Sequence, residues 1–320
     1  MIKKIKKRLL ISITLAGLLY LGFTIYAEFD QLLLAFEKFN WIWIPVIIVL
    51  TIFNYLARFL KWRYYLNLLQ VKIKDSDSLV IFLSGLVMSV TPGKMGELLK
   101  SYLVKEVTET PVSKTAPIII LERITDFVSL IIIALAGAYF FEFGRGIVLG
   151  TGIFFLVLII AMGNRKIALA VITYIEKKKI LEKHIHSLHN AYESSYRMLR
   201  GKPLFLMLLL STVAWFFECL GYHLILINFG VNLGLLWASF AYAFSTIVGA
   251  ITMLPGGLGA TEGSLAFLVI QKGFSKELAV ASTFIIRVVT LWLAVLVGLV
   301  SISLYQIRFG KIPIETDTIQ

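Results

Sequence analysis

The sequence predicts an all-α integral membrane protein with six full transmembrane helices and two inverted, re-entrant helical hairpins. Of its 320 residues, 58% are hydrophobic and only 16% are charged, whereas soluble proteins carry about 25% charged residues. The apolar residues form long runs rather than the amphipathic spacing of soluble helices. Two of these regions are interrupted by Pro-Gly sequences, and most of the 31 Lys and Arg residues stand near the ends of the runs. These observations exclude a soluble domain.

Six apolar runs are long enough to cross a bilayer core, which takes about 20 residues of helix. They cover residues 9–27, 41–60, 117–141, 146–163, 203–228 and 277–305. A basic segment, residues 1–8, precedes the first run and resembles the start of a signal peptide. No small-residue cleavage site follows it, so we expect a retained first span.

Two further apolar regions are broken in the middle. The first runs over 79–91, stops at Thr91-Pro92-Gly93 and continues as a short segment, 94–107. The second runs over 235–253, stops at Leu254-Pro255-Gly256-Gly257 and continues over 260–271. Because Pro and Gly break helices, each region should be two helical pieces joined at a turn.

The two broken regions resemble each other. Both contain P-G-x-x-G at the break, both are followed by Ser-Lys (residues 113–114 and 275–276), and Arg123 in the next span matches Arg287. Three full spans separate the hairpins, so the repeats, about 79–141 and 235–305 within a single membrane domain 1–320, should be inverted. Transporters recurrently use such inverted repeats with broken helices. The alternative is two proline kinks in ordinary spans, which gives eight transmembrane helices.

The charge distribution predicts an orientation. With the N-terminus in the cytoplasm and each broken region a hairpin, most Lys and Arg residues fall on the cytoplasmic side, whereas 28–40 carries Glu28, Asp30 and Glu37 outside. We therefore expect a multi-pass protein of the cell membrane with both termini cytoplasmic. The net charge of +12 then reflects this orientation and not a nucleic-acid partner. The polar segment 164–202 should form amphipathic helices on the cytoplasmic surface, near anionic headgroups.

No motif indicates an enzyme. The sequence contains no H-E-x-x-H, no G-x-S-x-G and no glycine-rich nucleotide loop, and its one cysteine, Cys219, lies in an apolar run. We therefore expect no catalytic residues, no metal and no cofactor. Ionisable residues inside the membrane are expensive and usually functional, so they define the candidate site.

The two breaks predict an anion-binding cavity. The half-helix that begins at Lys94 should direct free N–H groups and a positive dipole end into it, and glycines let a ligand approach the backbone. The candidate binding residues of the two hairpins are Gly93, Lys94, Gly96, Glu97, Gly256, Gly257, Gly259 and Glu262. For Glu97, Thr261 and Glu262, helix capping and dipole compensation form the alternative reading.

The spans add four more candidates. Arg123 can bind the anion or pair with Asp126 at i, i+3. Arg287 has no acidic neighbour at helical spacing, so it needs Glu218 or a bound phosphate as its partner. We expect Lys94 and Arg287 to reach a common phosphate, about 10 Å apart or less.

Three cations at the cytoplasmic end of the second span, Arg58, Lys61 and Arg63, are read as snorkelling anchors.

Three blocks of sequence resemble a known family. They are residues 89–97 with P-G-K-M-G-E, the span that opens Glu122-Arg123-Ile124-Thr125-Asp126, and residues 254–262 with P-G-G-L-G-A-T-E. The chain is similar over nearly its whole length to the lysylphosphatidylglycerol synthase transmembrane-region family, the flippase-like domain of multiple peptide resistance factors. The resemblance implies a lipid flippase-like membrane protein, here expected as a stand-alone member without the synthase domain.

We therefore expect a flippase or scramblase that moves an anionic phospholipid or a polyprenyl-phosphate-linked lipid between leaflets. The alternatives are a secondary transporter of a small anionic solute and a membrane scaffold for a lipid-modifying enzyme. A cavity open sideways to lipid favours the first, and one sealed from lipid favours the second. The expected partners are anionic membrane lipids, with a homo-oligomer or a separate lipid-modifying enzyme left open.

Overall fold

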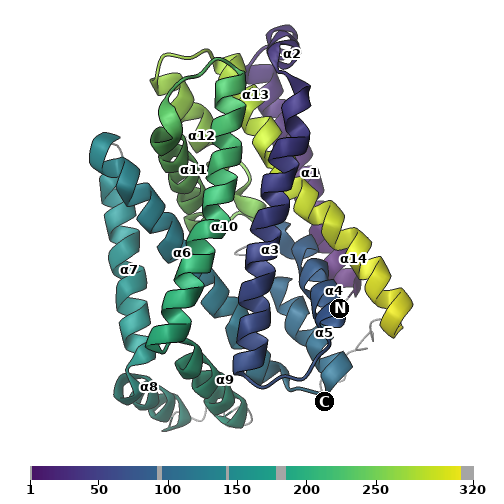
Figure 1. Cartoon of the computed structure of the whole chain (residues 1–320), viewed down its shortest axis with the longest axis vertical. Coiled ribbons are helices and arrows are strands. Elements are labelled where there is room, and N and C mark those ends of the chain that lie inside the picture. Colours follow the sequence, from purple (N-terminus) through teal and green to yellow (C-terminus); the bar gives the residue numbers. More distant parts are fainter. Residues whose placement is uncertain (1, 92–95, 142–143, 178–184, 311–320) are drawn as a thin grey trace.

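The described part of the chain consists of helices. A computed structural model describes residues 2–91, 96–141, 144–177 and 185–310 (Figure 1), and its regular elements in these ranges are all helical, which confirms the all-α fold class. The first half contains α1 (Ile2–Tyr26), α2 (Phe29–Lys38), η1 (Trp41–Trp43), α3 (Ile44–Leu68), α4 (Asp75–Gly85), η2 (Leu86–Val90), α5 (Leu99–Thr108) and α6 (Val112–Phe141). The second half contains α7 (Arg145–Gly163), α8 (Arg165–Lys177), α9 (Ile185–Met198), α10 (Gly201–Asn228), α11 (Gly234–Ile251), η5 (Pro255–Gly257), α12 (Ala260–Gln271), α13 (Lys276–Arg287), η6 (Val288–Trp292) and α14 (Leu293–Phe309).

Several of these helices suit a bilayer. Among the described residues, five helices are long and apolar enough to cross a membrane, and a sixth candidate is the pair Thr14–Tyr26 and Phe29–Lys38, bent by 92°. The five are Trp41–Leu68, Arg145–Gly163, Gly201–Asn228, Gly234–Ile251 and Lys276–Phe309. In water an apolar helix must bury its surface against protein, yet only 6% of the apolar window of α7 is buried. Such a helix is stable on the outside of the bundle only when lipid covers it.

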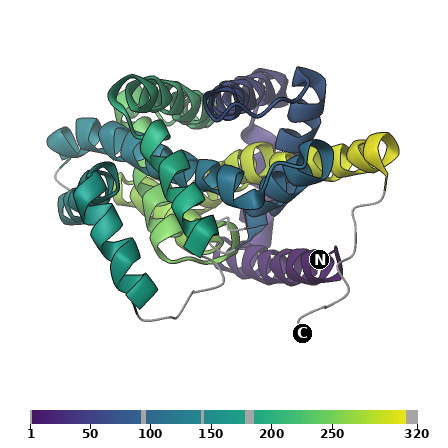
Figure 2. The ribbon, with the colours of Figure 1, turned by 90° about the horizontal axis from the view of Figure 1, so that it is seen from below.

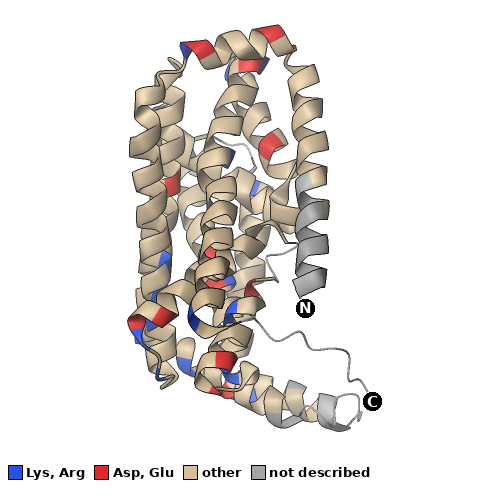
Figure 3. Cartoon of the chain, turned by 90° about the vertical axis from the view of Figure 1, so that its right-hand side faces the viewer, with Lys and Arg blue, Asp and Glu red and all other residues tan. Residues whose placement is uncertain are grey.

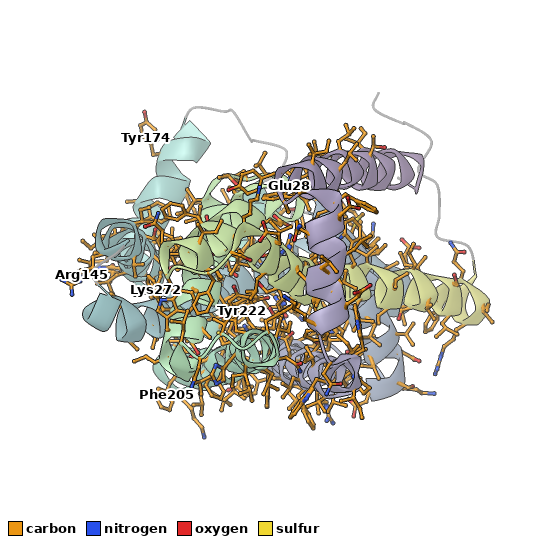
Figure 4. All side chains as sticks on the ribbon, turned by 90° about the horizontal axis from the view of Figure 1, so that it is seen from above. Glu28, Arg145, Tyr174, Phe205, Tyr222 and Lys272 are labelled. Atoms are coloured by element: carbon orange, nitrogen blue, oxygen red, sulfur yellow. The ribbon has the colours of Figure 1, made fainter. Side chains whose placement is uncertain are left out.

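Side-chain burial separates an inside from a lipid-facing outside. Tyr222 of α10 lies within the bundle and is fully buried, whereas Phe205 on the same helix points outward and is 70% exposed (Figure 4). Exposed large apolar side chains also line α7, including Phe154 at 61%. Aromatic and aliphatic surface of this extent marks a membrane-facing or interaction surface.

Each predicted broken region is two helices that fold back on each other. α4 packs on α5 and α11 packs on α12. The first pair occupies one half of the molecule, which also holds α8 and α9, and the second pair occupies the opposite half (Figure 1). The two pairs therefore lie toward opposite ends of the bundle.

The helices that follow the two pairs exchange partners. α6, which follows the first pair, packs on α11, and α14, near the end of the chain, packs on α4 and η2. α3 and α10 pack together along one side of the bundle, with α1 on the opposite side (Figure 2). This reciprocal packing is the arrangement that a two-fold-related pair of repeats would produce.

A close backbone approach fixes α14 against the first pair. A methyl group on Gly298 would lie 2.1 Å from the backbone nitrogen of Val87 in η2, which is shorter than any real contact. Glycine is therefore required at residue 298 because η2 and α14 touch through their backbones.

The described ends of the chain and the charged residues are not spread evenly over the molecule. The described start of α1 and the described end of α14 lie toward the end of the molecule that carries α8 and α9, while α2 lies across the other end (Figure 1). Lys, Arg, Asp and Glu gather at both ends, and a smaller group lies at mid-depth between them (Figure 3). This mid-depth group is the candidate site.

Candidate functional site

The second break is held open by glycines in the left-handed region. Gly256, Gly257 and Gly259 have φ angles of 61°, 68° and 87°, which residues with a Cβ adopt only with strain. A methyl group on Gly257 would also lie 2.7 Å from Oγ1 of Thr261. The sequence Pro255–Gly257 therefore forms a tight turn from which α12 starts in a new direction.

The first break is described on its two flanks only. Thr91 ends one arm, and its Oγ1 accepts a hydrogen bond of 3.0 Å from the backbone N–H of Gly96, which ties the start of the second arm to the end of the first. The predicted site residues Gly93 and Lys94 lie outside the described residues, so the expected distance between Lys94 and Arg287 is not tested.

The last turn before the first break meets the second break. η2 contacts η5, and a methyl group on Gly256 would lie 3.5 Å from the Cα of Val90. Non-helical backbone survives at membrane depth only when protein buries it or a cavity adjoins it. This contact provides that environment for the second break.

Arg287 is paired with a carboxylate from the second break. Its Nε lies 2.7 Å from Oε1 of Glu262, with side-chain exposures of 9% and 0%, and its Nη2 donates to the carbonyl oxygen of Gly256 at 2.6 Å. The other carboxylate oxygen of Glu262 accepts the N–H of Gly259 at 2.8 Å. Glu262 therefore caps α12 and is also the counter-ion of Arg287. The sequence analysis expected Glu218 or a bound phosphate in that role.

The first break carries a matching pair. Nη2 of Arg123 lies 3.3 Å from Oε2 of Glu97. Glu97 follows P-G-K-M-G as Glu262 follows P-G-G-L-G-A-T, and Arg123 and Arg287 each lie in the helix after the pair. Each hairpin glutamate thus contacts the arginine of its own following helix, a similarity that the sequence alone did not show.

Asp126 gathers three cations at the centre of the cluster. It pairs with Nη2 of Arg58 at 2.7 Å, with Nζ of Lys61 at 2.8 Å and with Nη2 of Arg123 at 3.3 Å. The Arg123–Asp126 contact is the i, i+3 pair considered from the sequence. Lys61, 1% exposed in its side chain, also donates to Oγ1 of Thr125 and to Oγ of Ser211.

The prediction that Arg58 and Lys61 are snorkelling anchors is therefore wrong. Both side chains point into the bundle because Asp126 stands there as a buried counter-ion, and an ion buried with a partner is more stable than one buried alone. Arg63 alone of the three is substantially exposed, at 46%, and it pairs with Asp75 near the end of α3.

Lys100 is a buried cation that sequence reasoning missed. Its Nζ lies 2.6 Å from Oε2 of Glu122 and 3.4 Å from Oε2 of Glu97, and 4.9 Å from the centroid of the Trp62 ring. Its position one helical turn after Glu97 on an otherwise apolar stretch was the signal available in the sequence.

Glu218 enters the site from α10. It is buried, at 8% exposure, and accepts a hydrogen bond of 2.7 Å from the hydroxyl of Tyr242 on α11. Tyr55 of α3 lies on the same cavity and donates to the carbonyl oxygen of Thr290 in η6. The two tyrosines were also missed, because a tyrosine in an apolar run does not differ from a core residue.

A cavity of about 390 Å³ joins these groups. Its wall includes Arg58, Arg123 and Arg287 together with Asp126 and Glu218. Hydroxyl groups of Tyr55, Ser89, Thr91, Tyr242, Thr246, Thr261 and Thr290 also belong to lining residues. Of the predicted site residues, Gly256 and Gly257 line it as well, whereas Glu97 and Glu262 stand behind the arginines that do.

The cavity reaches the apolar surface of the molecule. Ile120 of α6 and Met253 and Leu254 after α11 line it, and these side chains are 49%, 65% and 41% exposed. Ile120 lies in the first half of α6, and Met253 and Leu254 directly follow α11. Part of the cavity wall therefore consists of exposed apolar side chains.

One buried donor of Arg123 is unused. Its Nε–H has no hydrogen-bond partner among the residues that the structure describes. A buried N–H without an acceptor is unfavourable.

The relatives of this chain are membrane proteins. Residues 9–298 match the model of a family described as the lysylphosphatidylglycerol synthase TM region. A UPF0104 membrane protein of Methanocaldococcus jannaschii is 26% identical over 71% of this chain and 97% of its own length. One of Methanothermobacter thermautotrophicus is 24% identical over 85% of this chain and 88% of its own. A third UPF0104 membrane protein, from Pyrococcus horikoshii, is 26% identical over 74% of this chain and 79% of its own length.

Proposed function

Because the chain belongs to the family of the lysylphosphatidylglycerol synthase transmembrane region, we propose that it moves an anionic lipid between the leaflets of the cell membrane. The phosphate of a phospholipid or of a polyprenyl-phosphate-linked lipid enters the cavity, while its hydrocarbon chains stay in the bilayer. The observation that carries this proposal is a three-arginine cavity whose wall includes lipid-exposed side chains.

The arginines suit a phosphate. A phosphate at membrane depth is costly unless charged groups and donors replace its water. Arg58, Arg123 and Arg287 approach from three different helices, and guanidinium groups bind phosphate through two parallel N–H donors. The phosphate would therefore join a network in which these arginines are already paired with carboxylates.

The rim suits a lipid better than a soluble anion. A water-soluble anion needs a polar path from the aqueous phase, whereas a lipid needs a lateral opening for its chains. Ile120, Met253 and Leu254 provide an apolar edge to the cavity. This edge favours the lipid over the small anionic solute that the sequence left as an alternative.

We further propose that α4–α5 and α11–α12 are re-entrant hairpins of two inverted repeats. The reciprocal packing of α6 on α11 and of α14 on α4 supports this, as do the matching pairs Glu97–Arg123 and Glu262–Arg287. Movement of one repeat against the other would expose the cavity to either leaflet in turn. The π-helical turn Val288–Trp292 directly follows Arg287, and such turns are frequent at functional sites.

The orientation proposed from the sequence fits this arrangement. The described start of α1 and the described end of α14 lie toward the end with α8 and α9 (Figure 1), and we propose that this end is cytoplasmic, where basic helices meet anionic headgroups. We also propose that the chain is a transporter and not an enzyme, because the cations that line the cavity among the described residues are Arg side chains, which bind anions.

Lipid exchange in proteoliposomes tests the proposal. Dithionite quenches a fluorescent lipid in the outer leaflet, so protein-dependent exchange raises the quenched fraction beyond half. We expect exchange of anionic phospholipids without ATP and slower exchange of a zwitterionic one. Arg123→Gln should slow exchange about tenfold or more, since a hydrogen bond to a charged group contributes about 1.5–3 kcal/mol, and Arg123→Lys should restore part of the rate.

Arg63→Gln is the matched control, because Arg63 is a paired arginine outside the cavity and its loss should leave the rate unchanged. Equal rates with and without protein across several anionic lipids would refute the flippase proposal. Uptake of a soluble organic phosphate by the same vesicles would then favour the solute transporter. Absence of both lipid exchange and phosphate uptake would favour the membrane scaffold for a lipid-modifying enzyme.

A further inference from the structure

Inverted repeats imply that a lateral opening of the cavity in one repeat has a counterpart in the other. The apolar edge formed by Ile120, Met253 and Leu254 is called the first portal here. Ile120 stands three residues before Arg123, and Met253 and Leu254 directly precede Pro255. A two-fold axis in the membrane plane exchanges the two leaflets, so the counterpart of the first portal should face the opposite leaflet.

Three residues of the other repeat occupy the corresponding positions. Phe284 stands three residues before Arg287 on α13, and Val90 and Thr91 directly precede the proline of the first break. Thr91 lines the cavity, as Leu254 of the first portal does. α13 lies in the half of the molecule that carries α2, whereas the pair that leads into α6 lies in the opposite half (Figure 1). Phe284, Val90 and Thr91 are called the second portal.

The two portals differ in what covers them. The side chains of the first portal are between 41% and 65% exposed, whereas Val90 and Thr91 are 0% and 2% exposed. The cover of the second portal includes α1. Ala16 of α1 belongs to the same buried apolar cluster as Val90, and the ring of Tyr20 lies 4.9 Å from the ring of Phe284, centroid to centroid.

α1 lies directly behind the cavity wall. Leu291 lines the cavity and also belongs to the apolar cluster that α1 joins. A methyl group on Gly259, beside the second break, would lie 3.0 Å from Cδ1 of Leu19. Arg287, on the cavity wall, interacts electrostatically with Tyr20. α1 therefore occupies the space through which a lipid chain would pass at the second portal.

The contacts of α1 are of a kind that lipid can replace. Nε1 of Trp292, in the π-helical turn after Arg287, donates to the hydroxyl of Tyr20 at 2.8 Å. The other contacts described above are apolar, and Leu18 on the outer face of α1 is 64% exposed. Because lipid tails are as apolar as these side chains, departure of α1 exposes no apolar surface to water.

The end of α1 has the features of a hinge. α1 meets α2 at an angle of 92°, and the residue between them, Glu28, has φ 61° and ψ 112°. A positive φ is uncommon for a residue other than glycine. Hinges are formed by a few residues at the ends of elements that absorb a change in φ and ψ, so α1 can swing about Glu28 while α2 stays in place.

Resting on the proposed function and its inverted repeats, we propose that Phe284, Val90 and Thr91 form a second lateral portal for the hydrocarbon chains of the anionic lipid, and that α1 closes it. The phosphate binds the arginines of the cavity while the chains enter through one portal from one leaflet. They leave through the other portal into the opposite leaflet. The second portal opens when Tyr20 separates from Trp292 and α1 swings outward.

A reversible lock on α1 tests this inference. Tyr20→Cys and Phe284→Cys, introduced together, are bridged by a short bifunctional methanethiosulfonate. The bridge should lower exchange of the fluorescent anionic phospholipid to the rate of protein-free vesicles. A reductant that cleaves it should restore the rate, which shows that the locked protein is folded. The same reagent on Tyr26→Cys, at the 54% exposed face of α1, is the matched control and should leave the rate unchanged.

Labelling of Val90→Cys gives a readout that does not need transport. Val90 is fully buried, so a lipid-soluble maleimide should reach a cysteine there only when α1 has left. Tyr20→Phe removes the acceptor of Trp292 and should raise the labelling rate about two- to tenfold, as the loss of one hydrogen bond implies. Tyr26→Phe removes a hydroxyl from the exposed face of the same helix and should not change the labelling rate.

The outcomes separate this inference from the proposed function. A bridged protein that exchanges lipid at its unbridged rate overturns the second portal and leaves the lipid transporter intact. Equal labelling of Val90→Cys with Tyr20→Phe and with Tyr26→Phe also overturns the role of α1 as its cover. A wild-type protein that exchanges no anionic lipid refutes the proposed function, and this inference with it.

Discussion

The ion pair between Glu262 and Arg287 should hold the second hairpin to α13. Arg287→Met removes the donor 2.7 Å from Oε1 of Glu262, whose side chain is fully buried, and also the donor to the carbonyl oxygen of Gly256. Met keeps much of the side-chain volume. The substitution therefore tests mainly charge and hydrogen bonding.

The expected loss follows from burial. Removal of one partner from a buried ion pair costs about 3–5 kcal/mol, whereas removal of both is close to neutral. Glu262→Gln keeps an oxygen that can accept the N–H of Gly259. The double variant Glu262→Gln/Arg287→Met should therefore recover at least half of the loss, which gives a coupling free energy of about 2–3 kcal/mol.

Reversible unfolding in mixed detergent micelles, followed by tryptophan fluorescence, measures these free energies. The pair Lys276–Glu28 has the same separation of 2.7 Å but is exposed, so a matching cycle there should show little coupling. If the losses of unfolding free energy at Glu262 and Arg287 simply add, or if the two cycles give the same coupling free energy, the buried pair does not hold the hairpin. Either result refutes this reasoning.

Two further predictions concern packing and charge. Gly298→Ala should destabilise the fold by about 1–3 kcal/mol, because its methyl group would lie 2.1 Å from the backbone nitrogen of Val87. Gly146→Ala should not destabilise it, because a methyl group there would have nothing within 4 Å. Equal unfolding midpoints of the two variants would contradict the backbone contact. Asp126→Asn should reduce the yield of monodisperse protein far more than Asp75→Asn, because Asp126 is buried with its cations and Asp75 is 59% exposed. Comparable elution profiles of the two variants in detergent would contradict the role of Asp126 as the buried counter-ion of Arg58 and Lys61.

Local signals in the sequence were sufficient for the membrane class and for the two breaks. Apolar runs determine which segments suit a bilayer, and Pro255 with its glycines ends α11 by removing a donor and supplying positive φ angles. The structure also has helices where the sequence predicted amphipathic ones, in α8 and α9. Such features depend on residues within a few turns of one another.

The partners of the buried charges could not be predicted in the same way. Asp126 binds Arg58 and Lys61, which precede it by more than a full span, so only the three-dimensional packing of α3 on α6 decides that they turn inward. The link between Glu262 and Arg287 crosses a hairpin and a loop. Alignment of the two P-G-x-x-G blocks does not superimpose the glutamates, because Glu97 stands five residues after Pro92 and Glu262 seven residues after Pro255. Only the structure shows that each pairs with the arginine of its own following helix.

Blocking the edge of the cavity tests the central claim, that an anionic lipid headgroup crosses the membrane through this cavity. Ile120→Cys places a thiol on the lipid-exposed wall, and Ile132→Cys places one at the same 49% exposure on the same helix but away from the cavity. The natural cysteine, Cys219, is buried, so a bulky maleimide should react only at the introduced site.

The measurement is the rate of anionic lipid exchange in the same proteoliposomes before and after modification. The account predicts that the bulky adduct on Ile120→Cys lowers the rate to that of protein-free vesicles, while a small methylthio adduct there and the bulky adduct on Ile132→Cys leave it nearly unchanged. An unchanged rate after complete modification of Ile120→Cys would contradict passage through the cavity.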